Sequence, residues 1–91
     1  MKLKYFATYR EITRCKEEVI PAPEDIWALL LSLSQRYGAD FRKKLLSHDG
    51  MDIGMDAIIM VNGRNITHLD GKNTLLADSD AVSIFPLVAG G

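Results

Sequence analysis

The chain begins with a regular alternation of polar and apolar residues over residues 2–10. One set is Leu3, Tyr5, Ala7 and Tyr9, and the other is Lys2, Lys4, Phe6, Thr8 and Arg10. A period of two is typical of a strand with one buried face. Residues 17–20 predict a second strand, which Pro21 and Pro23 end. The gap between the two segments is short and polar, so we expect a hairpin.

The pattern then changes to a helical period. Glu24 and Asp25 suit the positive N-terminus of a helix, and Gly38 is in the usual place for a left-handed cap at its end. One continuous apolar face is predicted between them, formed by Ile26, Leu29, Leu30, Leu33 and Tyr37. A short second helix is expected at 40–46.

Residues 47–56 are rich in glycine and acidic residues and predict a flexible loop whose acid spacing does not fit a calcium site. Residues 57–61 are apolar and predict a buried strand. Asn62-Gly63 is a strong hairpin signal, after which residues 64–66 begin the return strand.

Residues 81–85 predict the last strand, which Pro86 ends because proline lacks a backbone N–H donor. One amphipathic helix must then pack across one mixed sheet of about five strands. The first and last strands can lie side by side at its centre. We therefore expect an α+β fold of the β-grasp, ubiquitin-like type over residues 1–86, followed by a flexible C-terminal tail at 87–91.

Composition narrows the class of function. With 91 residues the chain is expected to form one domain. Eleven Lys and Arg against twelve Asp and Glu give a net charge of −1, which argues against nucleic-acid binding. The single cysteine, Cys15, excludes an intrachain disulfide. We find no signal peptide and no apolar run long enough to span a membrane, so a cytoplasmic location is expected.

The usual signatures of an active site are missing from the sequence. No cysteine or histidine pairs have metal-binding spacing, so no metal site is expected. His48 and His68 fall in predicted loops without an acid placed beside them. Asp78 and Asp80 flank a turn, where aspartate usually bonds backbone groups. We therefore expect no active site of the chain's own and no bound cofactor.

The last residues offer a different chemistry, because Phe85 to Gly91 carry no charged side chain. Gly90 and Gly91 lack Cβ atoms and can thread a narrow channel, led by Leu87, Val88 and Ala89. The α-carboxylate of Gly91 is ionised at neutral pH and is a poor electrophile. It can react with a sulfur or amine nucleophile once it is activated as an acyl-adenylate.

Several segments resemble the MoaD family, the small sulfur-carrier subunits of molybdopterin synthase, in the longer form of archaea and anaerobic bacteria. The matching segments are Tyr5-Phe6-Ala7, Arg10-Glu11, Val61 to Ile66, Leu69-Asp70-Gly71 and Val82 to Gly91. The family has the β-grasp fold. Leu87 stands where the family usually has a second proline, and Asp78-Ser79-Asp80 where it has Asp-Gly-Asp.

This resemblance implies a cycle with two partners and a sulfur donor. A MoeB-like adenylating enzyme would use ATP to activate Gly91, and the sulfur donor would convert it to a thiocarboxylate. The tail would then enter the MoaE-like large subunit of molybdopterin synthase. There the sulfur would build the pterin dithiolene that holds molybdenum or tungsten.

The strand alternation also predicts a partner-binding surface. Phe6 and Phe85 fall on the outward positions of the first and last strands, and exposed neighbouring aromatic residues are typical of protein interfaces. We expect Ile66 and Pro86 to join them.

Three other functions remain open. The chain can be a sulfur carrier for thiamine-thiazole synthesis or tRNA thiolation. It can be a ubiquitin-like modifier joined to lysines through Gly91. It can also be an interaction module whose glycines are idle.

Overall fold

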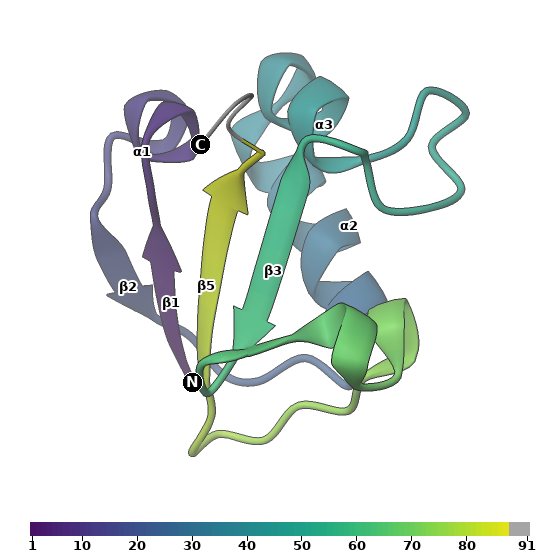
Figure 1. Cartoon of the computed structure of the whole chain (residues 1–91). Helices are drawn as coiled ribbons and strands as arrows, with labels where there is room; N and C mark the ends of the chain where they lie inside the picture. The colour runs from purple at the N-terminus through teal and green to yellow at the C-terminus, as the bar shows by residue number, and fades with distance from the viewer. Residues whose placement is uncertain (88–91) are drawn as a thin grey trace.

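A computed structural model describes residues 1–87, in which five strands form one mixed sheet with helices packed on one face (Figure 1). The strands are β1 (Lys2–Tyr5), β2 (Glu17–Val19), β3 (Ala57–Val61), β4 (Arg64–Asn65) and β5 (Ala81–Pro86). The helices are α1 (Thr8–Thr13), α2 (Ile26–Tyr37) and α3 (Ala39–Leu45), with 3-10 turns η1 (Ile66–His68) and η2 (Gly71–Asn73).

The strand order β2-β1-β5-β3-β4 confirms the predicted β-grasp fold. β1 runs parallel to β5, and the other neighbouring pairs are antiparallel. The first and last strands of the described chain therefore lie side by side, as expected. β5 is the central strand, bonded to β1 on one side and along its whole length to β3 on the other.

Helix α2 covers the inner face of the sheet and confirms the predicted apolar period. Its inward residues meet Leu3 and Tyr5 of β1 and Val82 and Ile84 of β5 in a single core. Asp25 is the N-cap, and its Oδ1 accepts the Ala28 N–H at 2.8 Å. The inward residues of α2 are Ile26, Leu29, Leu30, Leu33 and Ser34.

Gly38 joins α2 to α3 in a conformation different from the expected left-handed cap. Its φ is 89° and its ψ is −167°, a region that is essentially restricted to glycine. The predicted second helix is present and begins one residue earlier than expected, at Ala39. Phe41 and Leu45 of this helix are fully buried.

The prediction of a strand over residues 2–10 is wrong after Tyr5. Ala7 has φ 52° and ψ −125°, and the Tyr9 N–H bonds the Phe6 carbonyl oxygen at 3.1 Å. This is a type II′ turn, and it leads into α1. Tyr9 is fully buried as the alternation predicted, but from a helix, while Ala7 is exposed.

The return strand is shorter than predicted, whereas the loop at residues 47–56 is present. The return strand stops at Asn65, because the Asn65 side chain accepts the Thr67 N–H at 3.0 Å and starts the turn η1. The predicted loop 47–56 is present and is held by backbone bonds, including Ser47 N–H to the Asp52 oxygen at 2.8 Å and Gly54 N–H to the Leu45 oxygen at 2.8 Å.

None of the helices in residues 1–87 is long and apolar enough to cross a membrane.

Candidate functional site: an aromatic face beside the end of β5

The open face of the sheet carries a stacked pair of phenylalanine rings. Lys4 of β1 lies opposite Ser83 of β5 and Tyr5 opposite Ile84, so the next position brings Phe6 beside Phe85. The two rings stack with centroids 4.3 Å apart and planes 10° from parallel. The Phe6 N–H bonds the Ile84 carbonyl oxygen at 3.1 Å and fixes this register. Both side chains stay partly exposed, as the alternation predicted.

Strand β3 adds two apolar side chains to the same face. Ile58 lies opposite Phe85, and Met60 opposite Ser83. Both are half-buried, whereas Ile59 and Val61 between and beyond them are buried in the core. We call Phe6, Phe85, Ile58 and Met60 the aromatic face. Sequence reasoning missed Ile58 and Met60, although the same alternation in residues 57–61 places them outward.

Positive charge borders the aromatic face on the β1 side. The Arg10 guanidinium lies 5.8 Å from the centre of the Phe6 ring, within the usual range of a cation–π contact. Its Nε also donates to the Tyr5 carbonyl oxygen at 3.3 Å. Lys2 and Lys4 share the outward positions of β1. An apolar centre with a charged border is the usual make-up of a protein interface.

The end of β5 is tied to its neighbours beyond the last strand residue. Pro86 lies opposite Ala57. Leu87 is the residue expected to start the tail. Its N–H donates to the Asp56 carbonyl oxygen at 2.9 Å. The Tyr9 hydroxyl donates to the Lys44 carbonyl oxygen at 3.0 Å and lies 3.4 Å from that of Asp56. Burial, and to a smaller extent the charge of Asp56, raises the pKa of Tyr9 to about 12, so the hydroxyl keeps its proton. Its hydrogen bonds join α1 and α3 to the base of the tail.

The remaining predicted site residues fall in two groups. Val88, Ala89, Gly90 and Gly91 lie outside the described residues. Ile66 is described, and its predicted place on the exposed surface is wrong, because its side chain is 3% exposed and packs in the core. The turn η1 begins at Ile66 and directs it inward.

A carboxylate network holds the β1 edge of the site. The hydroxyls of Tyr5 and Tyr37 donate to Oε2 of Glu18 at 2.9 and 2.6 Å, and Arg36 donates to Oε1 at 2.6 Å. Partial burial opposes ionisation of Glu18, but these three bonds outweigh it and lower the pKa of its carboxyl. Burial, followed by the bond to Glu18, raises the pKa of Tyr5. The network joins β1, β2 and α2.

Three other titratable side chains have hydrogen-bond partners in the structure. Asp80 Oδ2 accepts the Ala77 N–H at 2.9 Å, which confirms the turn-forming role expected of it. Asp78 Oδ1 accepts the more distant Ala22 N–H at 2.8 Å. The Cys15 thiol donates to the Glu17 carbonyl oxygen at 3.1 Å. Within residues 1–87, no three His, Cys, Asp or Glu side chains are grouped so that they could hold a metal ion.

This fold and its comparisons define a ubiquitin-like protein of the sulfur-carrier and modifier type. The sequence model of the ThiS family matches residues 3–91, and the chain belongs to that family. The resemblance to MoaD proteins is therefore one part of a wider similarity, because several relatives of this chain carry other names.

Two relatives are similar to this chain in sequence. Small archaeal modifier protein 3 of Haloferax volcanii is 39% identical over 93 residues, covering 100% of this chain and 98% of the relative. A candidate sulfur carrier protein of Archaeoglobus fulgidus is 43% identical over 63 residues, 69% of each chain.

Solved structures are also similar to this chain, among them the following two. Small archaeal modifier protein 1 of Methanosarcina acetivorans has a TM-score of 0.81 and 36% identity, covering 99% of this chain and 94% of that one. A candidate molybdopterin converting factor, subunit 1, of Pyrococcus furiosus has a TM-score of 0.73 and 30% identity, covering 96% and 95%.

Proposed function

We propose that the Gly91 carboxylate of this chain is activated by a MoeB-like enzyme and converted to a thiocarboxylate. The carboxylate attacks the α-phosphorus of ATP and releases pyrophosphate. A sulfur nucleophile then attacks the acyl-adenylate and releases AMP. The chain supplies the reacting terminus and the docking surface, while the catalytic groups belong to the activating enzyme.

One observation carries this proposal: the aromatic face lies directly beside the end of β5, the strand that leads toward Gly91. A partner that covers Phe6 and Phe85 holds the chain at the point where Pro86 and Leu87 leave the sheet. Contacts between the partner and this face can then supply the binding energy that positions the terminus, so the terminus itself need not contribute any contact.

The fate of the sulfur is the next step of the proposal. We propose delivery to the pterin dithiolene, with the chain acting as the small subunit beside a MoaE-like large subunit. The relative from P. furiosus named as a molybdopterin converting factor supports this role. Here the aromatic face would bind the large subunit while the tail enters its active site.

The second candidate is a protein modifier, and two relatives named as modifiers favour it. They are 39% and 36% identical to this chain, against 30% for the P. furiosus relative. In this role the amine of a target lysine attacks the same acyl-adenylate, forms an isopeptide bond and releases AMP. Both candidates share the activation of Gly91 and differ only in the nucleophile.

The activation is tested by intact-mass measurement. The chain is incubated with its cognate adenylating enzyme, ATP and sulfide, and we expect a mass gain equal to the difference between a sulfur and an oxygen atom. A variant that lacks Gly91 is the control and should stay unchanged while keeping its fold. The proposal is overturned if no cognate activator produces the gain.

The fate is tested by offering the activated chain two acceptors. A MoaE-like subunit with its pterin precursor should yield the dithiolene. A lysate digested with trypsin should instead yield lysines carrying residues 73–91, because no Lys or Arg follows Lys72. The acceptor that is used decides between the two roles.

A further inference from the structure

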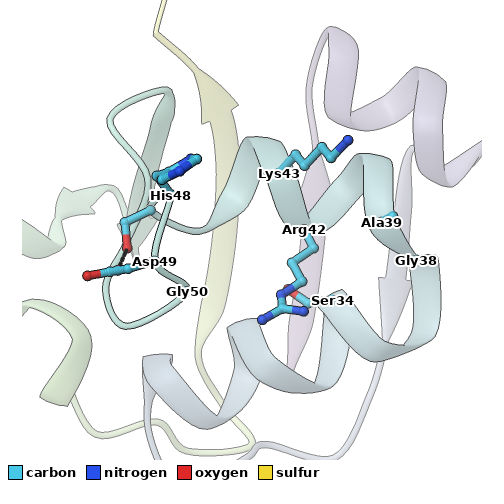
Figure 2. A pocket seen from close by; sticks show the side chains of 9 residues that line it. Ser34, Gly38, Ala39, Arg42, Lys43, His48, Asp49 and Gly50 are labelled. Carbon is cyan, nitrogen blue, oxygen red and sulfur yellow. Dashed lines mark hydrogen bonds between the residues drawn. The ribbon is translucent and has the colours of Figure 1, made fainter.

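A second surface feature lies on the helix side of the sheet, away from the aromatic face. An open groove of about 800 Å³ lies between the end of α2, helix α3 and the start of the loop 47–56 (Figure 2). It is lined by Ser34, Gly38, Ala39, Arg42, Lys43, Ser47, His48, Asp49 and Gly50.

Two cationic side chains of α3 reach this groove. Figure 2 shows Arg42 directed toward Ser34 on α2 and Lys43 extending from the opposite side of α3, with His48 on the loop that follows this helix. The Arg42 guanidinium lies close against Gly50, since a Cβ atom on that glycine would come within 3.0 Å of Arg42 Nη2. Gly50 also has a φ of 74°, a backbone conformation that favours glycine.

The one acidic residue of the lining is directed to its own loop. Oδ1 of Asp49 accepts the Ser47 hydroxyl at 2.7 Å and the Met51 N–H at 2.9 Å. These bonds lower the pKa of Asp49 and keep it ionised as part of the loop. Among the described residues Asp49 forms no ion pair of 4.0 Å or less with Arg42 or Lys43, so the two cations and this one carboxylate leave a net positive charge in the groove.

The two cations also have no partner elsewhere in the described chain. Over residues 1–87, ion pairs of 4.0 Å or less occur at Arg36–Glu18 and Lys72–Asp52 and do not include Arg42 or Lys43. Lys44 follows directly in the sequence and extends the run of positive charge. Basic residues suit the last turn of a helix, but Arg42 turns away from that end toward α2 and Gly50.

The lining favours carboxylates over a nucleotide or a nucleic acid. His48 is the one lining residue with an aromatic ring, and no phenylalanine, tyrosine or tryptophan lines the groove to offer a base a stacking platform. Arginine pairs with carboxylates through two parallel hydrogen bonds, and lysine adds a point charge beside it. An extended acidic segment can place successive carboxylates along such a groove.

We propose that this groove binds an acidic segment of a partner protein through Arg42 and Lys43. Helices α2 and α3, which line the groove, lie on one side of the sheet (Figure 1). The aromatic face points to the other side, because its strand residues alternate with residues buried in the core. Both surfaces can therefore be occupied at once, so a protein held at the groove leaves the aromatic face free for a second partner. This inference does not depend on the chemistry of Gly91.

The test is an NMR titration of the 15N-labelled chain with a capped oligoglutamate peptide at low salt. We expect amide shifts concentrated in residues 38–50, with a weak affinity that decreases further as salt rises. The double variant Arg42→Glu/Lys43→Glu should weaken binding by at least about tenfold. The control Lys16→Glu/Arg64→Glu makes the same change in net charge at exposed positions outside the groove and should bind as the parent chain does.

A milder variant, Arg42→Gln/Lys43→Gln, serves if charge reversal unfolds the chain, and it should also weaken binding. The proposal is overturned if both glutamate variants lose affinity equally, since binding would then follow net charge alone. Shifts that follow Lys2 and Lys4 instead of residues 38–50 overturn it as well. So does a parallel titration in which inorganic phosphate produces the shifts at residues 38–50 and the peptide does not.

Discussion

The ring of Phe6, which directly follows β1, stacks on the ring of Phe85 in β5 at a centroid distance of 4.3 Å, although β1 and β5 are the first and last strands along the described chain. The contact depends on the parallel pairing of β1 with β5. It places an exposed aromatic pair where the chain leaves the domain toward Gly91.

Truncation of either ring should weaken partner binding. Buried aromatic residues carry much of the energy of protein interfaces, so Phe6→Ala or Phe85→Ala should cost about 2 kcal/mol, roughly thirtyfold in Kd. Calorimetry with the adenylating enzyme measures the loss. Leu75→Ala is the control, because Leu75 is an exposed apolar residue that lies outside the aromatic face. Equal losses in all three variants would remove the assigned role of the ring pair.

Replacement of Ala7 by glycine should stabilise the domain. Ala7 has φ 52° and ψ −125°, a conformation that glycine adopts with much less strain. The relief should exceed the extra entropy of glycine in the unfolded chain and give a net gain of about 1 kcal/mol. Chemical denaturation measures it. Ala28→Gly, inside α2, should lower stability by a similar amount, and a loss in both variants would show that the turn is not strained.

The Glu18 network should make stability depend on pH. The pKa of Glu18 is lowered in the folded chain, so its stabilisation is present above the unfolded pKa of about 4.3 and is lost as the pH falls through the folded pKa. Glu18→Gln should therefore cost about 1 kcal/mol at neutral pH and progressively less in acid. Urea unfolding of both proteins across this range measures the difference. A pH-independent difference would contradict the prediction.

Truncation of Ile66 should act on folding and not on a binding surface. Its side chain is 3% exposed and packs in the core, so Ile66→Ala should cost about 2–4 kcal/mol of stability. Leu31→Ala is the control, because Leu31 is 45% exposed on α2 and its loss should change stability by about 0.5 kcal/mol or less. Ile66→Ala with unchanged stability and weakened partner affinity would restore Ile66 to the interface.

Much of the fold was predictable because single periods mark its elements. The spacing of Ile26, Leu29, Leu30 and Leu33 predicted α2, and the alternation in residues 81–85 predicted β5. That alternation also predicted the outward direction of Phe85. These features depend on residues close together in sequence, so local pattern is sufficient to find them.

The two failed predictions have different physical reasons. Tyr9 lies four residues after Tyr5, a separation that points the same way in a strand and in a helix. The alternation therefore could not show that the chain turns at Ala7. At Ile66, the hydrogen bond that the Asn65 side chain accepts from the Thr67 N–H converted an expected strand residue into a buried turn residue.

The sequence by itself determined the strand and helix periods, the apolar C-terminal segment with its two glycines, and the charge run at Arg42, Lys43 and Lys44. Only the tertiary structure decided which side chains meet. The stacking of Phe6 on Phe85 requires a register between strands at opposite ends of the chain. The groove requires α3 to pack against α2 while Gly50 approaches Arg42. Such contacts are set by packing across the whole domain, which no local pattern of residues contains.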